Sequence, residues 1–324
     1  MLCIAIAGYG SIGRGVEYAI DRNEDMTLVA IFTRRPIASL APRTDTPVVP
    51  MDDAAQWAGK VDVLILCGGS FADLPVQGPA LAKHFHTVDS FDTHADIPYY
   101  FANMDAALKT SGKLGIIAAG WDPGLFSLNR LYMSAMLPQG ESHTFWGRGI
   151  SQGHSNAIRQ IEGVADAVQY TCPIERAIEQ VRSGAMPTLS THEKHTCECY
   201  VVLKTGADAA RVEREIVTMP HYFADYETHV HFISQEALAS DYTSAATKGI
   251  VFRSGYTGQE NTHHMAYSLD LASNAEFTAH ALVAYARAIF RMAAEGRTGA
   301  LTVFDVAPAL LSTKTGEEIR AEML

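Results

Sequence analysis

The stretch from Ile4 to Gly13 constrains the fold more than any other part of the chain. A short apolar run, Ile4 to Ala7, leads directly into a turn of the form G-x-G-x-x-G, and a helical pattern follows. In such a turn the first glycine permits a tight bend, the second lets the backbone approach a pyrophosphate, and the third allows close packing of helix on strand. The helix dipole and its free N–H groups then attract the phosphate charge. We therefore predict a dinucleotide-binding turn made of Gly8, Tyr9, Gly10, Ser11, Ile12 and Gly13.

Further apolar segments follow at the intervals expected of parallel strands, and helical patterns separate them. Strands that alternate with helices form a parallel sheet that is covered on both faces. We therefore expect an α/β fold whose first domain, residues 1–120, is a Rossmann-type doubly wound parallel sheet. The expected strands are Thr27–Thr33, Val61–Cys67, Thr87–Asp89 and Leu114–Ala118, and the expected helices are Pro75–Phe85 and Asp96–Ser111.

Two arginines stand where the second strand ends, in the run Thr33-Arg34-Arg35. An NAD-binding domain usually has an acidic residue here for the ribose 2′-hydroxyl, whereas a guanidinium group suits a 2′-phosphate. We expect these three residues to bind NADP; the alternative is a pair of solvated arginines on a loop. The turn after the next strand lies at the same edge of the sheet, so we expect cofactor contacts there also, from Cys67, Gly68, Gly69 and Ser70.

Two loops that carry carboxylates follow later strands of the same sheet. The first runs from Asp89 to His94 and includes Asp92, and the second is Gly120-Trp121-Asp122-Pro123-Gly124. Because the carboxyl ends of parallel strands share one edge, both loops should project over the cofactor. Asp in a Ser/Thr-rich loop, or before proline, is also a common turn residue. As a pair beside a hydride carrier, however, Asp92 and Asp122 are candidates for acid–base work.

The pattern changes after Gly124, and we expect a second domain over residues 121–294. Residues 144–155 are rich in glycine, aromatic and hydrogen-bonding side chains, which is typical of a ligand-binding loop. Beyond them, strands separated by helices indicate an open α+β sheet with one face covered by helices. An apolar stripe from Phe277 to Met292 predicts a core helix. We expect residues 295–324 to dock back onto the first domain, because much of this tail is apolar.

The composition narrows the class of protein. The 324 residues carry a net charge of −11, which argues against nucleic acid as a partner because phosphate binding needs basic patches. No apolar run approaches the roughly 20 residues of a membrane span. Met1 leads straight into the first expected strand, so we expect no signal peptide. Five cysteines in a chain of this length do not form a disulfide framework, and we expect a cytoplasmic enzyme.

His195, Cys197 and Cys199 raise the alternative of a metal site, because alternate residues of a strand share one face. More often such side chains belong to a half-buried strand, and no further pair at ligand spacing is obvious. We therefore expect no metal ion.

Six segments carry a resemblance to a known family: the glycine turn, Phe32–Arg35, Asp89–His94, Gly120–Gly124, His143–Gly147 and Ser151–Ser155, of which the last three are the most specific. Together they resemble the meso-diaminopimelate dehydrogenase family, over essentially the whole chain. The resemblance implies NADP-dependent oxidative deamination at the D-centre of meso-2,6-diaminopimelate, a reversible reaction that gives L-2-amino-6-oxopimelate and ammonia. It also implies a role in lysine biosynthesis and a homodimer with a Rossmann domain, a dimerisation region and a substrate sheet.

Matched residue by residue, the resemblance assigns Asp92 and Asp122 to the reacting amino group of the substrate. Gln152 and Gly153 match groups near the carboxylate of the D-centre, and Thr171 matches a hydroxyl near the distal carboxylate. The remaining substrate-binding matches are two aromatic walls and a distal asparagine: Trp121, Trp146 and Asn274.

Two positions depart from the family. Cys197 stands where the family has an arginine that clamps the distal carboxylate, and Thr247 stands where it has a histidine. Loss of the arginine leaves a substrate charge poorly matched, unless Lys248, Arg253 or Lys194 compensates. Two alternatives therefore stay open: a related D-amino-acid dehydrogenase with a different distal group on its substrate, and a non-catalytic NADP-binding regulatory protein.

Overall fold

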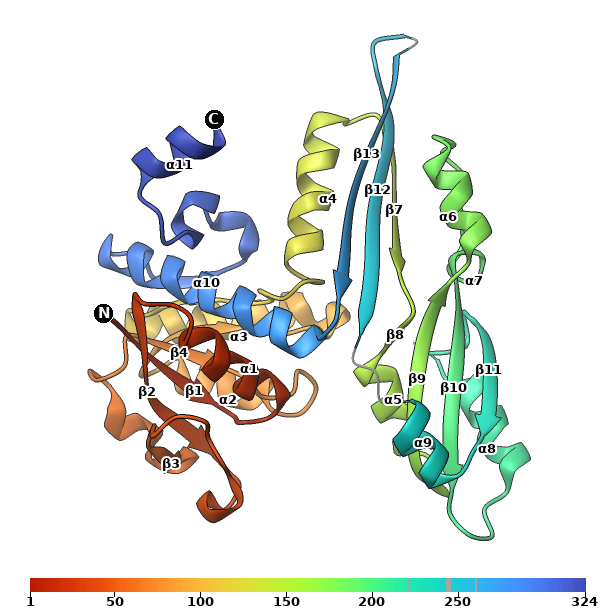
Figure 1. Cartoon of the computed structure of the whole chain (residues 1–324), viewed down its shortest axis with the longest axis horizontal. Helices are drawn as coiled ribbons and strands as arrows, with labels where there is room; N and C mark the ends of the chain where they lie inside the picture. Colours follow the sequence, from red (N-terminus) through yellow and green to blue (C-terminus); the bar gives the residue numbers. More distant parts are fainter. Residues whose placement is uncertain (221, 243–245, 260) are drawn as a thin grey trace. The chain divides into compact units, whose positions relative to one another are not determined.

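The computed structural model describes residues 1–220, 222–242, 246–259 and 261–324, without the side chain of Gln152. These residues form two compact units (Figure 1), of which unit 1 is Met1–Leu128 with Ala275–Leu324 and unit 2 is Asn129–Asn274. The division differs from the expected one at both ends of the second domain. The first unit extends past residue 120, and it resumes at residue 275 rather than at 295 because a long helix packs on its sheet.

Unit 1 is built on a seven-stranded sheet of order β14-β6-β5-β4-β1-β2-β3, in which every neighbouring pair is parallel. The expected doubly wound sheet is confirmed, with short strands β3 and β14 added at its edges. Ligands bind such sheets where the strand order reverses, which here is at β1. The strands are β1 Leu2–Ala7, β2 Met26–Thr33, β3 Val48–Pro50, β4 Val63–Leu66, β5 His86–Asp89, β6 Leu114–Ile116 and β14 Gly299–Leu301.

Helices bury both faces of this sheet. The helices concerned are α1 Ser11–Ile20, α2 Leu74–Leu81, α3 Ile97–Ser111 and α10 Asn274–Ala294. Ile4 and Ile6 of β1 belong to the core cluster shared with α1 and α10, whereas Ala5 and Ala7 belong to the cluster shared with α2 and α3. Burial on both faces explains why the strands are uninterrupted apolar runs in the sequence.

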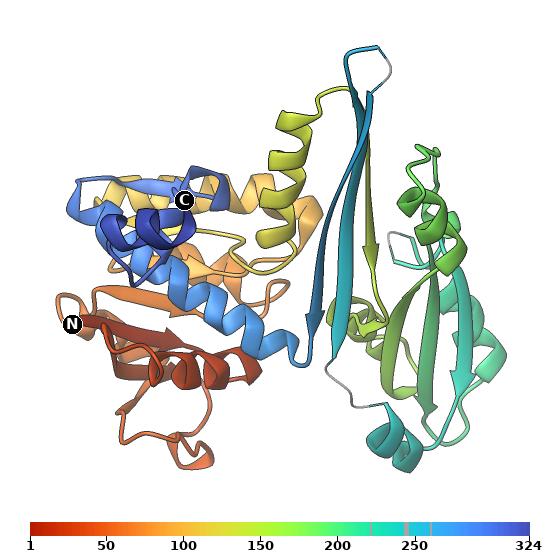
Figure 2. The same cartoon turned by 45° about the horizontal axis from the view of Figure 1, so that its top comes forward.

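The long helix α10 lies beside α1 on one face of the sheet of unit 1 (Figure 2). A Cβ on Gly15 of α1 would lie 2.9 Å from the Cβ of Ala279, so the two helices approach closely there. The expected core role of α10 is confirmed for Tyr285, Ile289 and Met292, which are buried.

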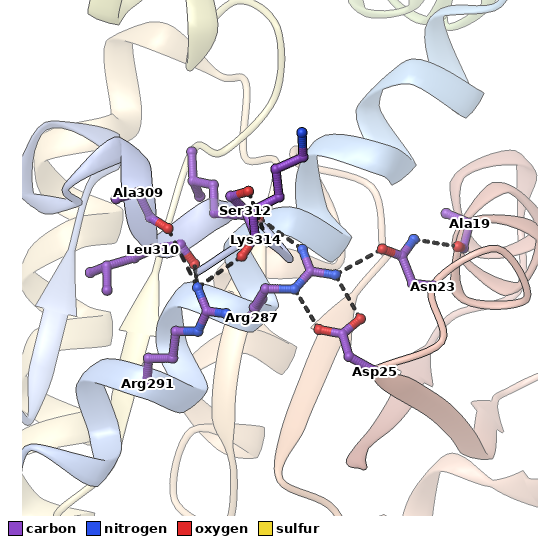
Figure 3. Close-up of polar contacts among 10 residues, drawn as sticks. Ala19, Asn23, Asp25, Arg287, Arg291, Ala309, Leu310, Ser312 and Lys314 are labelled. Atoms are coloured by element: carbon purple, nitrogen blue, oxygen red, sulfur yellow. Dashed lines mark hydrogen bonds and ion pairs between the residues drawn. The ribbon is translucent and has the colours of Figure 1, made fainter. Parts of the chain in front are cut away.

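Buried Arg287 of α10 joins three segments of unit 1 (Figure 3). Its guanidinium group donates to the Asp25 carboxylate at 2.6 and 2.9 Å, to the Asn23 side chain at 2.7 Å and to the carbonyl oxygen of Leu311 at 2.8 Å. Arg291, four residues further along α10, donates to three more carbonyls of the tail. The tail therefore docks onto the first unit, as expected. Its elements after β14 are η4 Val303–Asp305, η5 Pro308–Leu311 and α11 Gly316–Met323.

Unit 2 contains two sheets rather than the single open sheet expected, so that prediction was wrong. One sheet has the order β11-β10-β9-β8 and the other β13-β12-β7 (Figure 1). The error has a physical reason: alternating patterns identify strands but do not say which strands pair. The strands are β7 Gly140–Trp146, β8 Gly149–Ile150, β9 Val164–Pro173, β10 His195–Leu203, β11 Glu227–Phe232, β12 Thr247–Thr257 and β13 Asn261–Leu271. The helices are α4 Leu125–Met136, which spans the unit boundary, α5 Gln152–Arg159, α6 Glu175–Arg182, α7 Thr191–Lys194, α8 Ala209–Val217 and α9 Gln235–Asp241.

Candidate functional site

The glycine turn connects β1 to α1 at the point where the strand order reverses. Gly8 has a φ of +95°, and a Cβ on Gly13 would lie 2.3 Å from the carbonyl oxygen of Gly8, so both positions require glycine. By contrast, nothing among the described residues lies within 4 Å of a Cβ placed on Gly10. In the described part of the chain, no side chain caps the N-terminus of α1. Open space in front of helical N–H groups fits the pyrophosphate of a dinucleotide.

Both arginines that follow β2 line one cavity of about 410 Å³. Arg35 donates from its guanidinium group to the carbonyl oxygen of Tyr9 in the glycine turn, and its backbone N–H donates to Thr33 Oγ1 at 3.0 Å. Arg34 forms an ion pair with Asp73, with 2.5 Å between Nη2 and Oδ1. A cavity with two cations on its wall fits an anionic group such as a 2′-phosphate. Its lining is Thr33, Arg34, Arg35, Pro36, Ile37, Pro50, Met51 and Asp52.

The loop after β4 lies against the glycine turn on its other side. The backbone N–H of Cys67 donates to the carbonyl of Ala7 at 2.8 Å, and a Cβ on Gly8 would lie 3.3 Å from the carbonyl group of Cys67. Burial raises the pKa of the Cys67 thiol, which keeps the thiol neutral and unreactive. Asp73, which sequence reasoning missed, accepts from the backbone N–H of Gly69 at 2.9 Å as well as from Arg34. It therefore links the loops on the two sides of β1.

A buried carboxylate, Glu17 of α1, supports the glycine turn. Glu17 is 1% exposed and accepts hydrogen bonds from the Tyr9 hydroxyl and from the backbone N–H groups of Arg43 and Thr44. Burial alone would raise its pKa, but these hydrogen bonds hold the pKa of Glu17 below its usual range. Burial, together with the contact to Glu17, raises the pKa of Tyr9 to about 12, so Tyr9 is a neutral donor. Sequence reasoning missed Glu17, although a charge among the buried positions of the first helix was a usable signal.

The two carboxylate loops leave the sheet at the same edge as the glycine turn. Asp92, in the loop after β5, is exposed, and its backbone N–H donates to Ser70 Oγ at 3.1 Å. The loops after β5 and β6 touch, because a Cβ on Gly120 would lie 3.6 Å from the Cβ of Ser90. The structure therefore brings together the loops of β4, β5 and β6, as the sequence predicted.

Trp121 and Asp122 lie in a tight corner between β6 and α4. A Cβ on Gly124, whose φ is +129°, would lie 2.0 Å from the carbonyl oxygen of Gly120, so the corner requires glycine. The Trp121 ring packs edge-on against Phe126, with ring centroids 5.3 Å apart. Trp121 and Asp122 are both half-buried.

In unit 2, Trp146 ends β7 and contacts His195, the first residue of β10. The backbone N–H of Trp146 donates to His195 Nε2 at 3.0 Å, and the ring centroids lie 5.2 Å apart. Burial, with a smaller contribution from the charge of Lys194, lowers the pKa of His195 to about 4. The neutral ring can therefore accept this hydrogen bond, and His195 holds the end of the strand that carries Trp146.

Residues 144–155, which were expected to form a ligand-binding loop, are mostly regular structure, so the prediction of a loop was wrong. Strand β7 continues to Trp146, the short strand β8 follows, and α5 begins at Gln152. The glycines and polar residues of this segment take part in strand pairing and helix capping, whether or not they also bind a ligand. Gly153 is exposed, with nothing among the described residues within 4 Å of a Cβ placed on it. The side chain of Gln152 lies outside the described residues.

Polar residues of this segment fasten α5 to β9. Ser151 Oγ bonds to His154 Nδ1 at 2.8 Å, and His154 Nε2 bonds to the carbonyl oxygen of Tyr222 at 3.0 Å. A neutral ring protonated on Nε2 satisfies both partners, which agrees with the burial that lowers the pKa of His154. Ser155 Oγ donates to the Ser151 carbonyl at 2.6 Å and accepts from the backbone N–H of Gln169 at 3.0 Å.

Thr171, Cys197 and Thr247 come together around Gly149. Thr171 lies opposite Cys197 in the β9–β10 pair and opposite Gly149 in the β8–β9 pair, and a Cβ on Gly149 would lie 2.1 Å from Thr247 Oγ1. Gln169 Nε2 donates to Thr171 Oγ1 at 3.3 Å. Burial raises the pKa of the Cys197 thiol to about 12, so this group of side chains is uncharged at neutral pH.

Two cations considered as substitutes for the family's arginine are used elsewhere. Lys248 Nζ lies 2.6 Å from the Asp270 carboxylate. Arg253 Nε donates to the carbonyl oxygen of Leu137 at 2.7 Å, and Arg253 sits six positions along β12 from Thr247, or about 20 Å at ~3.3 Å per residue. The structure does not bring Arg253 to Cys197.

The remaining predicted features lie in the described part of the chain. Asn274 is the first residue of α10 and is half-buried. Cys197 and Cys199 lie in an apolar core cluster. Among the described residues, no group of three or more His, Cys, Asp and Glu side chains is arranged to hold a metal ion. Within the same residues, no helix is long and apolar enough to cross a membrane.

The described residues of unit 1 provide an uncapped helix behind a glycine turn, a cavity lined by two arginines, and two carboxylate loops at one edge of the sheet. These features define a dehydrogenase with a nicotinamide dinucleotide cofactor. Comparison with known proteins identifies the family. The model of the diaminopimelic acid dehydrogenase C-terminal domain matches residues 120–273. The chain is 54% identical to the meso-diaminopimelate D-dehydrogenase of Ureibacillus thermosphaericus over 321 residues, which are 99% of this chain and 98% of that protein. The chain therefore belongs to the meso-diaminopimelate dehydrogenase family, whose members are amino-acid oxidoreductases that act on a CH–NH2 group.

Solved structures agree with this assignment. The structure of C. glutamicum DAP dehydrogenase in complex with DAP has a TM-score of 0.94 and 43% identity, covering 100% of this chain and 99% of that one. An engineered D-amino acid dehydrogenase bound to NADP+ has a TM-score of 0.91 and 42% identity, with coverage of 100% and 99%. The order of elements found in both units is thus that of the family.

Proposed function

We propose that this protein catalyses the NADP-dependent oxidative deamination of the D-centre of meso-2,6-diaminopimelate, giving L-2-amino-6-oxopimelate and ammonia. The observation that carries the proposal is that the glycine turn and the loops of Asp92 and Asp122 share one edge of the sheet of unit 1. The relative from U. thermosphaericus is named for this activity, and C. glutamicum DAP dehydrogenase was solved with DAP. The same site serves the reverse reaction.

The chemistry asks the protein to hold an amine in a fixed position and to move one proton. Asp92 and Asp122 orient the substrate ammonium group and accept a proton from it. The nicotinamide ring, when bound, accepts the hydride from the α-carbon. The carboxylates then stabilise the positive iminium, water adds to its carbon, and ammonia leaves. By resemblance to the family, the substrate-binding residues are Trp121, Trp146, Gln152, Gly153, Thr171 and Asn274.

Asparagine variants of the two carboxylates test this assignment. Asp122→Asn and Asp92→Asn each keep the shape of the side chain and remove its basicity, so we expect kcat to fall by about 10²- to 10⁴-fold. The Kd for NADP, measured by quenching of protein fluorescence, should change little. Wild-type turnover in either variant would remove that residue from the reacting centre.

The cofactor is proposed to be NADP because Arg34 and Arg35 line the cavity after β2, and because an engineered relative binds NADP+. Charge-assisted hydrogen bonds contribute about 1.5–3 kcal/mol each. Arg35→Ala should therefore weaken NADP binding by about 10- to 100-fold and NAD binding much less. Equal losses for the two cofactors would contradict the 2′-phosphate assignment. The remaining proposed contacts are Gly8, Tyr9, Gly10, Ser11, Ile12, Gly13, Thr33, Cys67, Gly68, Gly69 and Ser70.

A second candidate is a D-amino-acid dehydrogenase whose substrate carries a neutral distal group. It is favoured by the uncharged cluster of Thr171, Cys197 and Thr247, where the family has an arginine and a histidine. Initial rates with NADP decide between the candidates, using meso-diaminopimelate, D-lysine, D-alanine and D-norleucine. If the meso compound is no better than D-alanine, the first proposal fails. If none is turned over, a non-catalytic NADP-binding role remains.

We also propose a cytoplasmic homodimer. The family resemblance supports the dimer, and the free state of all five cysteines is typical of a reducing compartment. Light scattering on the purified protein tests the dimer, because a single mass of 35.2 kDa would contradict it.

A further inference from the structure

Asp89, the last residue of β5, is a fully buried carboxylate with no part in the chemistry described above. Its Oδ1 accepts from the backbone N–H groups of Phe91 at 2.9 Å and Ala118 at 3.2 Å. Its Oδ2 accepts from the hydroxyl of Tyr100, on α3, at 2.8 Å. The side chain therefore has three donors, and two of them are main-chain groups of different loops.

These two loops are the ones that carry Asp92 and Asp122. The Phe91 amide immediately precedes Asp92. The Ala118 amide lies four residues before Asp122, in the segment that leaves β6. The backbone carbonyl of Asp89 also accepts from the N–H of Ala119 at 2.9 Å, so one residue binds both loops through three main-chain donors.

The sheet itself cannot make this connection. Pairing of β5 with β6 ends at Val88 and Ile116, one residue before Asp89. Ala118 has a φ of +56°, a left-handed conformation that turns the chain out of the strand and leaves its N–H without a ladder partner. The Asp89 carboxylate supplies the acceptor at that point.

We propose that Asp89 is a positioning residue, which fixes the loops of Asp92 and Asp122 relative to each other through one shared carboxylate oxygen. The proposal rests on the function proposed for those two residues, but it concerns a side chain that touches neither substrate nor cofactor. Spacing matters here because a pair of carboxylates can orient an amine only when both stand at the correct distance from it.

The buried charge supports a functional reason for this residue. Burial raises the pKa of Asp89 to about 6, although the hydrogen bonds from Phe91, Tyr100 and Ala118 act in the opposite direction. Tyr100 is the titratable side chain that faces it, and burial raises the pKa of Tyr100 further, so Tyr100 stays neutral. Keeping an anion here opposes folding, which is the pattern expected where function rather than stability selects a residue.

Substitutions that keep or remove the shared oxygen test the proposal. Asp89→Leu has similar bulk and no acceptor; we expect kcat with the preferred substrate to fall at least tenfold, while the Kd for NADP stays within twofold. Asp89→Asn keeps an oxygen for both loop amides and should restore kcat to within threefold of wild type. Tyr100→Phe is the matched control, because it removes the third donor and leaves both loop amides paired; its kcat should also stay within threefold.

Hydrogen exchange of the backbone amides supplies a readout that needs no substrate. In Asp89→Leu, peptides covering residues 90–93 and 117–122 should exchange faster, whereas residues 31–36 at the arginine loop should not. If the leucine variant does not fold, Asp89→Ser replaces it, since one hydroxyl reaches at most one amide. The kcat of the serine variant, and the protection of its two loops from hydrogen exchange, should both be lower than in wild type.

Three outcomes would overturn the proposal: wild-type kcat with unchanged exchange in the leucine or serine variant, an asparagine variant as impaired as leucine, or a Tyr100→Phe variant as impaired as leucine. If the proposed function itself is wrong, the wild-type protein will lack turnover. The hydrogen-exchange pattern of the variants would still report whether Asp89 holds the two loops, so the two failures can be told apart.

Discussion

Replacing Asp89 by asparagine should make the protein more stable at neutral pH, which is the reverse of the usual effect of changing a buried polar residue. The folded-state pKa of Asp89 is raised from 3.8 to about 6. A group whose folded pKa lies above its unfolded value contributes stability that is fully present below the unfolded pKa and is lost as the pH rises through the folded pKa.

The magnitude follows from the size of the shift. About two pKa units at ~1.4 kcal/mol each give about 3 kcal/mol, which the wild-type fold loses between about pH 4 and pH 7. Asparagine cannot ionise, so Asp89→Asn avoids this loss. The free energy of unfolding of the variant minus that of wild type should therefore rise by about 3 kcal/mol over the same range.

Urea unfolding at pH 4.0, 5.0, 6.0, 7.0 and 8.0 measures this difference, with tryptophan fluorescence as the signal and equal m-values as the check on comparability. All other ionisable groups are common to the two proteins, so their contributions cancel in the subtraction. A difference that stays constant from pH 4 to pH 8 would refute the reasoning, since it would mean that Asp89 does not titrate in this range.

Three further predictions follow from the geometry. Gly13→Ala should lower both the melting temperature and NADP affinity, because its Cβ would meet the Gly8 carbonyl at 2.3 Å. Gly10→Ala, whose Cβ has no atom of a described residue within 4 Å, should weaken NADP binding and leave the melting temperature unchanged; equal thermal effects would contradict this. Asp25→Asn should destabilise unit 1 by about 1–3 kcal/mol, because it removes the anion beside buried Arg287. The Arg287 hydrogen bond holds the pKa of Asp25 below its usual range, so this contribution is present above the unfolded pKa and is lost as the pH falls through the folded pKa; a variant as stable as wild type at pH 7 would disprove it. Cys197, whose pKa is raised to about 12, should resist iodoacetamide at pH 8 in folded protein, as mass spectrometry of labelled peptides would show; rapid labelling would contradict its burial.

Local rules made much of unit 1 predictable. The glycine turn, the alternation of strands with helices and the apolar runs all depend on residues close together in sequence, so β1, β2, β4, β5 and β6 could be placed from the chain alone. The arginines after β2 and the two carboxylate loops followed from one topological rule, because all of them come directly after strands of one parallel sheet. What this reasoning missed were Glu17 and Asp73, whose partners include Arg43 and Arg34, 26 and 39 residues away in sequence.

Unit 2 was less predictable for a definite reason. Its strands pair across long separations, such as Thr247 of β12 with Leu271 and Gly249 of β12 with Trp146, and no local pattern records such pairings. The prediction of a loop over residues 144–155 failed for a related reason, because a segment with capping serines and strand-pairing glycines has the same composition as a binding loop.

The sequence alone predicted the dinucleotide-binding turn of Gly8 to Gly13, the arginine pair after β2 and the alternation of strands with helices in unit 1. Each of these features depends on steric and charge preferences of residues that are close together in sequence. Only the tertiary structure decided that α10 packs on the first sheet, that Cys197 sits uncharged opposite Thr171, and that Asp89 binds both carboxylate loops. Each of these depends on burial and on partners from distant segments, and such relations exist only once the chain has folded.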